Sequence, residues 1–467
     1  MALFIIRHQH DAERCPAKDP YSGAAILNHL TRANASQQGI QIQGEAIVQG
    51  EHALYLIVES IDEGRLRSFL KPFEEAGSVD LYPASTCARA VSSGGCAGAM
   101  PRVDQMGPAV DPEEACHRAI EAGLVLHRAH PLNCETSVPA LIGGTVMPNA
   151  HFYVRNHFQI PVLDPSLWRL SVHGLVDRPL SLSLRDLQNL PSQTLIVTLE
   201  CAGNGRSRLD PSVDGEQWRF GAVSTAEWTG VPLIEVLDRA GIKPGGRDVL
   251  LRGGDGGPLA GQTEITRFER SLNLDTVRDS QALLAYAMNG EPLPPQHGYP
   301  LRVVVPGWYA VTSVKWLTEI DVIDRAFTGH FQTDKYVYEW KRNGQLVREP
   351  VTLQRVRALI TEPRKDQVAL GGELAIRGVA WSGAAPIARV EVSVGNSPWR
   401  EARLVGDRKR GSWQWWELIT RVVPGPVTLR ARATDLAGRT QPEQPEWNRL
   451  GYGNNSIEEV SVLISSG

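Results

Sequence analysis

Residues 195–208 have the sequence LIVTLECAGNGRSR, and the rest of the chain is interpreted from this segment. The run 195–199 is apolar and partly β-branched, which predicts a β-strand. The segment 203–205 is Gly-Asn-Gly, and these residue types tolerate positive φ, so a turn is expected there. Cys201 therefore lies at the end of a predicted strand, just before a tight turn.

Two arginines, Arg206 and Arg208, follow Cys201 closely in the sequence. Nearby positive charge lowers the pKa of a thiol and favours the thiolate, which is a soft metal ligand or a nucleophile. The same guanidinium groups are suited to an oxyanion. A single cysteine in a strand is also often a small buried apolar residue. The loop alone leaves both interpretations open.

Several further segments place this loop in a specific context. They are 152–157 (FYVRNH), Trp218 with 221–228 (GAVSTAEW), 283–306 (LLAYAMNGEPLPPQHGYPLRVVVP), 313–317 (SVKWL) and 381–383 (WSG). Together with the cysteine loop, they resemble the sulfite oxidase family of molybdopterin-dependent oxidoreductases, in its bacterial, haem-free type. The resemblance extends from about residue 139 to the end of the chain.

The resemblance implies a set of cofactor-binding residues. It assigns Cys201 as the thiolate ligand of molybdenum, which is chemically sensible for a redox metal that accepts soft sulfur ligands. It places these further residues around the pterin: Tyr153, Asn156, His157, Asp255, His297, Arg302, Ser313 and Lys315. Arg302 and Lys315 have the charge needed to hold the terminal phosphate of the cofactor. Each charged residue taken singly could equally be a surface group or part of a structural ion pair.

The resemblance also implies a substrate pocket, formed by Arg155, Arg206, Trp218 and Tyr336 together with Cys201. Two arginines can hold an oxyanion through charge-assisted hydrogen bonds, and a tyrosine hydroxyl can donate a further one. Trp218 would form a wall of the pocket.

The segment 447–451 (WNRLG) departs from the pattern of animal sulfite oxidases. Those relatives carry a third pocket arginine at the position that aligns with Leu450, whereas here the arginine is the preceding residue, Arg449. Neighbouring side chains in an extended segment point to opposite faces. Arg449 is therefore expected to miss the pocket, which leaves room for a less charged or bulkier substrate than sulfite.

The implied activity is oxygen-atom transfer, with oxidation of sulfite or a related small sulfur compound as the first hypothesis. Electrons would pass to an external acceptor, since the paired-histidine haem segment of animal relatives is not found in this sequence. One alternative is a reductase of the same family, acting on nitrate or on an S- or N-oxide. The other is a non-catalytic binding or assembly protein.

Composition limits the remaining possibilities. A chain of 467 residues is expected to form about two to four domains, and a net charge of −4 gives no reason to expect a nucleic-acid partner. No apolar run is long enough to span a membrane, and the run after Met1 is too short for a signal peptide, so a cytoplasmic location is expected. Six cysteines in such a chain do not indicate a disulfide framework.

The predicted fold class is α+β, divided into four regions. Residues 1–95 are expected to be a small ferredoxin-like domain, because strand, helix and strand patterns follow one another closely. Residues 96–138 form a linker with a helix, and 139–345 a mixed α+β molybdopterin-binding domain. Alternating apolar residues after Glu349 indicate an antiparallel sandwich over 346–467. The resemblance implies that this last domain is immunoglobulin-like and forms a homodimer.

The N-terminal region carries several residues of metal-ligand type: His8, His10, Cys15, Cys87 and Cys96. They could converge on a second metal if the first and last strands of the region pair. The alternative is that they are scattered polar and core residues.

Overall fold

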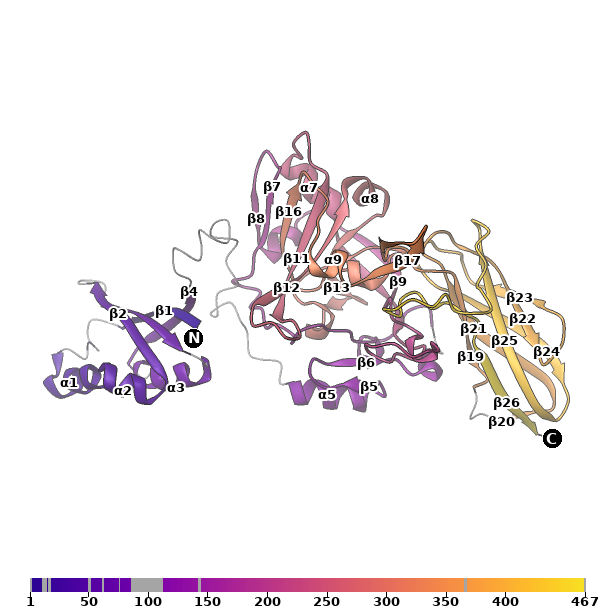
Figure 1. Cartoon of the computed structure of the whole chain (residues 1–467), viewed down its shortest axis with the longest axis horizontal. Helices are drawn as coiled ribbons and strands as arrows, with labels where there is room; N and C mark the ends of the chain where they lie inside the picture. Colours follow the sequence, from indigo (N-terminus) through magenta and orange to yellow (C-terminus); the bar gives the residue numbers. More distant parts are fainter. Residues whose placement is uncertain are drawn as a thin grey trace. The chain divides into compact units, whose positions relative to one another are not determined.

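The computed structural model describes residues 2–465 except 11–14, 16–17, 49–51, 61–62, 75, 85–111, 142–143 and 365–367. The chain divides into two compact units, Met1–Pro108 and Ala109–Gly467, and each is described by itself (Figure 1). Both units mix helices and strands, as expected for an α+β protein. Within the described residues, no helix has the length and apolar character needed to cross a membrane.

The N-terminal unit is a four-stranded antiparallel sheet with strand order β2-β3-β1-β4. Its elements are β1 (Ala2–Gln9), α1 (Pro20–His29), α2 (Arg32–Gln37), β2 (Ile40–Val48), β3 (Ala53–Ser60), α3 (Glu63–Glu74) and β4 (Ser78–Ala84). Side chains alternate along β1: Ile6 is buried together with Phe69 and Phe73 of α3, whereas Ile5 is partly exposed. The helices therefore cover one face of this sheet.

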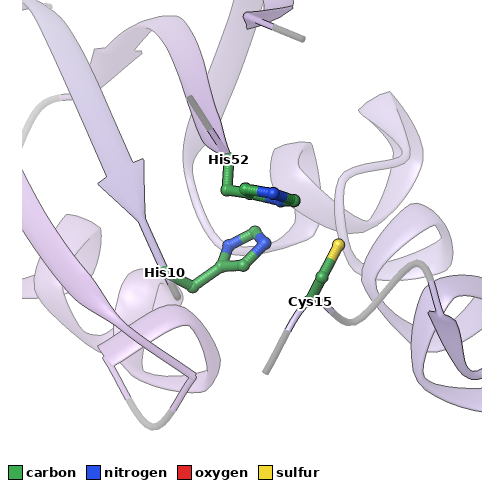
Figure 2. A group of neighbouring side chains, drawn as sticks. All are labelled: His10, Cys15 and His52. Atoms are coloured by element: carbon green, nitrogen blue, oxygen red, sulfur yellow. The ribbon is translucent and has the colours of Figure 1, made fainter. Parts of the chain in front are cut away.

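The end of β1 and the start of β3 meet at one end of this sheet. The register pairs Gln9 with Ala53, so His10 and His52 are the next residues along the two antiparallel strands. Their side chains lie together with that of Cys15, which comes from the segment between β1 and α1 (Figure 2).

The central part of the second unit contains two five-stranded sheets. One has the order β14-β13-β10-β9 with β15 paired to β13, and the other has the order β12-β11-β16-β7-β8. Neighbouring strands are antiparallel except β16 and β7, which are parallel, so the expectation of mixed strand directions is met. The strands are β7 (Leu170–Gly174), β8 (Leu180–Leu182), β9 (Gln193–Glu200), β10 (Val223–Pro232), β11 (Asp248–Pro258), β12 (Ile265–Asn273), β13 (Leu283–Met288), β14 (Glu291–Pro292), β15 (Arg302–Val304) and β16 (Leu317–Ile323).

Helices and shorter strands complete this part of the second unit. The elements that precede the sheets in the chain are α5 (Pro112–Glu121), β5 (Val125–Arg128) and β6 (Asn133–Glu135). The helices between and after the strands are α6 (Leu184–Gln188), α7 (Leu233–Ala240), α8 (Leu274–Asp279) and α9 (His330–Thr333). A hairpin of β17 (Val337–Arg342) and β18 (Gln345–Pro350) follows α9.

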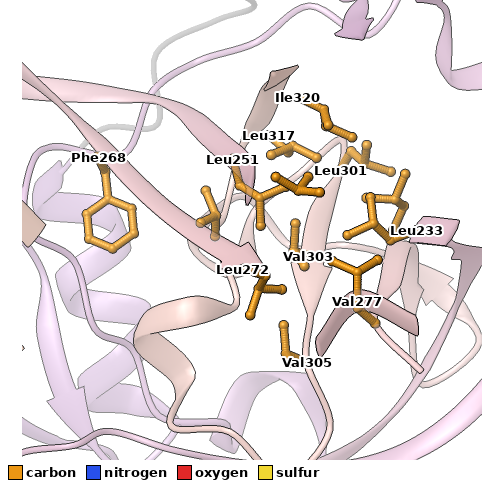
Figure 3. Close-up of a cluster of buried hydrophobic side chains, with 14 of the residues drawn as sticks. Leu233, Leu251, Phe268, Leu272, Val277, Leu301, Val303, Val305, Leu317 and Ile320 are labelled. Atoms are coloured by element: carbon orange, nitrogen blue, oxygen red, sulfur yellow. The ribbon is translucent and has the colours of Figure 1, made fainter. Parts of the chain in front are cut away.

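A buried apolar cluster joins the two central sheets and α7. Figure 3 shows its members Leu233, Leu251, Leu272, Val303, Leu317 and Ile320, which come from α7, β11, β12, β15 and β16. Truncating such a leucine to alanine costs about 2–5 kcal/mol of stability. The cluster matters for the site because Arg302 begins β15 and Lys315 precedes β16, so the core holds both cations in place.

The C-terminal part is an eight-stranded sheet with the order β19-β21-β24-β23-β22-β25-β26-β20. Its strands are β19 (Arg357–Glu362), β20 (Val368–Leu370), β21 (Gly372–Trp381), β22 (Ile387–Val394), β23 (Arg400–Val405), β24 (Gln414–Val422), β25 (Gly425–Asp435) and β26 (Glu459–Ser465). Ile376 and Trp416 from one half share a core with Val390 and Leu429 from the other. The sheet therefore folds over itself, as the alternating sequence predicts.

Candidate functional site

A pocket with about 650 Å³ of space free of protein atoms, partly open to solvent, lies beside Cys201. All nine residues that the family resemblance assigns to the cofactor line this pocket: Tyr153, Asn156, His157, Cys201, Asp255, His297, Arg302, Ser313 and Lys315. They come from five segments that are separate in the sequence and that the fold brings together. Arg155 and Tyr336, expected on the substrate side, also line it.

Cys201 lies where the strand-and-turn prediction placed it. Strand β9 ends at Glu200, and the Cys201 amide donates to the carbonyl of Ala222 at 2.9 Å, which continues the pairing with β10. The Asn204 amide then donates to the Cys201 carbonyl at 2.9 Å, and Gly205 has φ of +83°, so the chain turns sharply. The thiol is held at the pocket wall by backbone on both sides.

The protonation of Cys201 differs from the expectation drawn from its neighbouring arginines. Burial is the largest influence and raises the pKa of the Cys201 thiol, while the positive charges of Arg155 and Arg206 lower it only in part. The apoprotein therefore favours the thiol. A bound metal ion would stabilise the thiolate, because metal binding displaces the proton.

Glu200, next to the cysteine, is buried and anchors the loop to the C-terminal sheet. Its carboxylate accepts hydrogen bonds from Asn204 Nδ2 at 3.0 Å and Trp381 Nε1 at 2.9 Å. It also pairs with Arg357 of β19, with 3.4 Å between Oε1 and Nη1. Sequence reasoning missed this anchor, since Glu200, Arg357 and Trp381 become neighbours only through the fold.

One wall of the pocket carries buried positive charge with few counter-charges. Arg302 donates to the carbonyl oxygens of His297 at 3.0 Å and Ser313 at 3.1 Å, and burial lowers its pKa to about 10. Lys315 donates to the side-chain oxygen of Asn156 and to the carbonyl of Gln296. Burial, together with the charge of Arg302, holds the pKa of Lys315 well below its usual range. These partners are neutral, so the site favours an incoming anion.

Asp255 is the one carboxylate among the residues that line the pocket. Burial raises its pKa to about 7, and the charge of Lys315 opposes this rise. Its Oδ1 atom is buried without a hydrogen-bond partner. A buried polar atom without a partner usually marks a place where a ligand or water supplies one.

His297 lies in the same wall of the pocket as Arg302 and Lys315, and its side chain is neutral. Burial, aided by Lys315 and Arg302, lowers its pKa to about 3, and Nε2 lies 3.2 Å from the carbonyl oxygen of Asn149. In the tautomer that carries the proton on Nε2, this nitrogen donates to that carbonyl.

Arg155 and Tyr336, which were expected on the substrate side, lie close to His157 in the pocket. Tyr336 Oη lies 2.7 Å from His157 Nε2, and the Tyr336 ring stacks on Tyr452 with 4.9 Å between ring centres. Burial and the charge of Arg155 hold the pKa of His157 well below its usual range, so His157 is neutral. Arg155 donates to the side-chain oxygen of Asn133 at 3.3 Å and to the carbonyl of Asn156. Tyr452 was not singled out by the sequence, although it follows the aligned segment 447–451.

Arg206 and Trp218, which were expected to face the pocket, are not among its lining residues, although the charge of Arg206 acts on the Cys201 thiol. Their place in the substrate pocket stays a prediction. Arg206 donates to the carbonyls of Glu216 at 2.8 Å and Leu450 at 3.3 Å. A Cβ atom on Gly203 would lie 2.5 Å from this guanidinium, so the turn packs directly on it. Trp218 is fully buried and lies against His127, with 4.7 Å between ring centres. Both side chains support the loop.

Arg449 points away from the pocket, in line with the expectation. It forms a two-pronged pair with Glu339 at 2.7 and 2.9 Å, and its side chain is 60% exposed. Leu450 packs against the central apolar cluster. Among the described lining residues, Arg155 and Arg302 are the arginines of this pocket.

The N-terminal residues of metal-ligand type are only partly brought together. His10 and Cys15 lie close to each other and to His52, while His8 contacts His10. Cys87 and Cys96 lie outside the described residues. The sequence did not single out His52; its position just before the strand that pairs with β1 was the available signal.

The chain is similar to known proteins over most of its length. Residues 157–331 match the family model of the oxidoreductase molybdopterin binding domain, and residues 349–464 match that of the Mo-co oxidoreductase dimerisation domain. Human mitochondrial sulfite oxidase is 37% identical over 73% of this chain and 66% of its own length, and the mouse protein is 35% identical over 77% and 70%. The chain thus spans about two thirds of these curated relatives.

Two further similar proteins are named for other activities. The nitrate reductase [NAD(P)H] of Hordeum vulgare is 32% identical over 72% of this chain and 41% of its own length. The crystal structure of the sulfane dehydrogenase SoxCD from Paracoccus pantotrophus matches with a TM-score of 0.64 and 28% identity, over 79% of this chain and 97% of that chain.

Proposed function

Because the chain belongs to the sulfite oxidase family of molybdenum-dependent oxidoreductases, we propose that it oxidises sulfite or a closely related small sulfur compound. Electrons would pass to an external acceptor. The observation that supports this most is the pocket beside Cys201, where Arg155, Arg302 and Lys315 face a single carboxylate, that of Asp255. Such an excess of buried positive charge suits an anionic cofactor and an anionic substrate.

The residues present fit a molybdopterin cofactor. Cys201 offers the soft sulfur ligand, Arg302 and Lys315 offer cations for the phosphate, and Asp255 Oδ1 is an acceptor without a partner. When bound, the molybdenum centre supplies oxygen-atom transfer and the accompanying two-electron redox change. The chain itself supplies binding, orientation and fixed charge.

Arg155, Tyr336 and His157 are proposed to orient the substrate. Arg155 offers N–H donors to an oxyanion. In the tautomer of neutral His157 that carries its proton on Nε2, this nitrogen donates to Tyr336 Oη and leaves the phenol proton free for the substrate. We propose that Trp218 acts on catalysis through the position of the cysteine loop. Arg206 is proposed to act both through that position and through its charge, which lowers the pKa of the Cys201 thiol in part.

A reductase acting on nitrate or on an S- or N-oxide is the alternative function. It is favoured by Leu450, which stands where animal sulfite oxidases carry a third pocket arginine, and by the similarity to the barley nitrate reductase. A non-catalytic binding or assembly protein is the remaining alternative, and it predicts a preparation without molybdenum.

The finer features of the architecture also belong to this proposal. The strand order β2-β3-β1-β4 with its intervening helices supports a ferredoxin-like N-terminal domain. The folded-over C-terminal sheet supports an immunoglobulin-like domain, and its match to a dimerisation domain supports a homodimer. The cytoplasmic location expected from the sequence stays a prediction, which fractionation of native cells tests.

Two measurements test the proposed function. Elemental analysis of protein from a cofactor-competent host should find about one molybdenum per chain. Dye-linked assays in both directions should then show oxidation of sulfite or another sulfur compound. Turnover with nitrate or an oxide alone would favour the reductase, and a chain without molybdenum would favour the non-catalytic alternative.

A further inference from the structure

His10, Cys15 and His52 form a cluster of metal-ligand side chains in the N-terminal unit. Each offers one ligand atom, and these atoms all lie within 4.8 Å of one another. Figure 2 shows that the two imidazole rings and the cysteine sulfur converge from three different segments of the chain. The three residues are half-buried.

Backbone hydrogen bonds involve all three residues of the cluster. The His10 amide donates to the His52 carbonyl at 3.3 Å, which extends the β1–β3 ladder beyond Gln9 and Ala53. His52 has φ of +50°, a left-handed conformation that is uncommon outside glycine and costs free energy in a folded chain. On the third side, the Lys18 amide donates to the Cys15 carbonyl at 3.1 Å.

The His8 ring contacts the His10 ring. His8 lies two residues before His10, so the two side chains point to the same side of the extended chain. Its Nε2 lies 3.2 Å from Nδ1 of His10, and the His8 side chain is buried against Phe73 of α3. When Nδ1–H of His10 donates to His8, Nε2 of His10 keeps its lone pair. Metal-binding histidines are commonly oriented in this way by a partner on their other ring nitrogen.

A second group of neighbouring ligand types, His173, Glu319 and Asp321, does not have this character. Arg252 contacts both carboxylates of that group and Arg267 contacts Glu319, so cationic side chains already compensate the negative charge.

We propose that His10, Cys15 and His52 bind a zinc-type cation, with His8 as a positioning residue. Two imidazoles and a thiolate are the ligands preferred by Zn²⁺, and a three-residue site leaves a fourth position for water. Tetrahedral zinc with bonds of about 2.0–2.3 Å places its ligands about 3.3–3.8 Å apart. The cluster would therefore contract by at most about 1 Å on binding, which side-chain rotations can supply. This site is separate from the pocket beside Cys201 and does not depend on the proposed function.

The test uses the full-length, molybdenum-loaded protein. It is incubated with zinc chloride, freed of excess metal by gel filtration, and analysed for zinc and molybdenum per chain. About one zinc per chain is expected for the wild type, and most of it should be lost in Cys15→Ser and in His52→Ala. His117→Ala is the matched control, because this histidine is exposed on α5 in the other unit. Molybdenum content should be the same in all four proteins.

Cobalt substitution supplies a readout that is specific to the thiolate. Co²⁺ bound to the wild type should give an ultraviolet sulfur-to-metal charge-transfer band, which Cys15→Ser should abolish and His117→Ala should retain. Circular dichroism checks that the variants are folded. A wild type that retains no zinc, or variants that retain as much zinc as the control, would overturn the proposal. Loss of molybdenum in every protein would instead contradict the proposed function, because the two metals are counted separately.

Discussion

Glu200 and Arg357 form a buried ion pair directly beside the pocket cysteine, with 3.4 Å between Oε1 and Nη1 and both side chains almost fully enclosed. The pair links the last residue of β9 to the first residue of β19. Since Cys201 follows Glu200 immediately, the position of the thiol depends on a contact with the C-terminal sheet.

Arg357→Leu should therefore destabilise the protein and weaken cofactor retention. The substitution leaves the Glu200 carboxylate buried without its counter-charge, which typically costs about 3–5 kcal/mol. Thermal unfolding and molybdenum content measure the two effects. The matched control is Arg377→Leu in β21, where the arginine forms exposed pairs with Glu362 and Glu417, each of which is worth about 1 kcal/mol or less. Equal losses in the two variants would show that the buried pair has no special role.

Cys201→Ser should abolish turnover while the fold remains intact. A hydroxyl is a poor substitute for a soft thiolate ligand, whereas serine is close to cysteine in size. Steady-state assays and circular dichroism provide the measurement. Cys116→Ser is the control, because Cys116 is a free cysteine of α5 that is buried in a separate small cluster. An active Cys201→Ser enzyme would remove the thiolate from the proposed site.

Arg155→Met should raise KM for an anionic substrate about 10- to 100-fold, because a charge-assisted hydrogen bond contributes about 1.5–3 kcal/mol. Arg449→Met should leave KM unchanged, since Arg449 binds Glu339 on the surface. Comparing the two variants separates the loss of a pocket arginine from a general change in net charge. A similar KM in wild type and Arg155→Met would place the substrate elsewhere.

Asp255 should make the stability of the apoprotein depend on pH. Its pKa is about 7 in the folded protein, whereas an aspartate in an unfolded chain has a pKa of about 3.9. Between these values the folded state binds a proton that the unfolded state lacks, so the contribution of Asp255 to stability falls as pH rises from about 4 to about 7. The difference in unfolding free energy between wild type and Asp255→Asn should change across this range. A constant difference would contradict a raised pKa.

The local pattern of the sequence was sufficient for the central loop. Its apolar run became β9, its glycines became the turn, and Cys201 lies between them, because strand and turn preferences act over a few neighbouring residues. The nine cofactor residues were identified through family resemblance, since no spacing rule connects Tyr153 with Lys315. The sequence did not decide what Arg206 contacts. An arginine can bind an oxyanion, and it can equally donate hydrogen bonds to backbone carbonyls such as those that Arg206 contacts here.

The sequence by itself determined which chemical groups are available: one thiol at a strand end, cations in apolar runs, and histidines near the N-terminus. Only the tertiary structure decided what surrounds them. It paired Glu200 with Arg357 and brought His52 to His10. It also raised the pKa of Cys201 through burial against the effect of nearby arginines. Desolvation and long-range pairing depend on the distance in space between residues that are remote in the chain, and a local pattern contains no information on that distance.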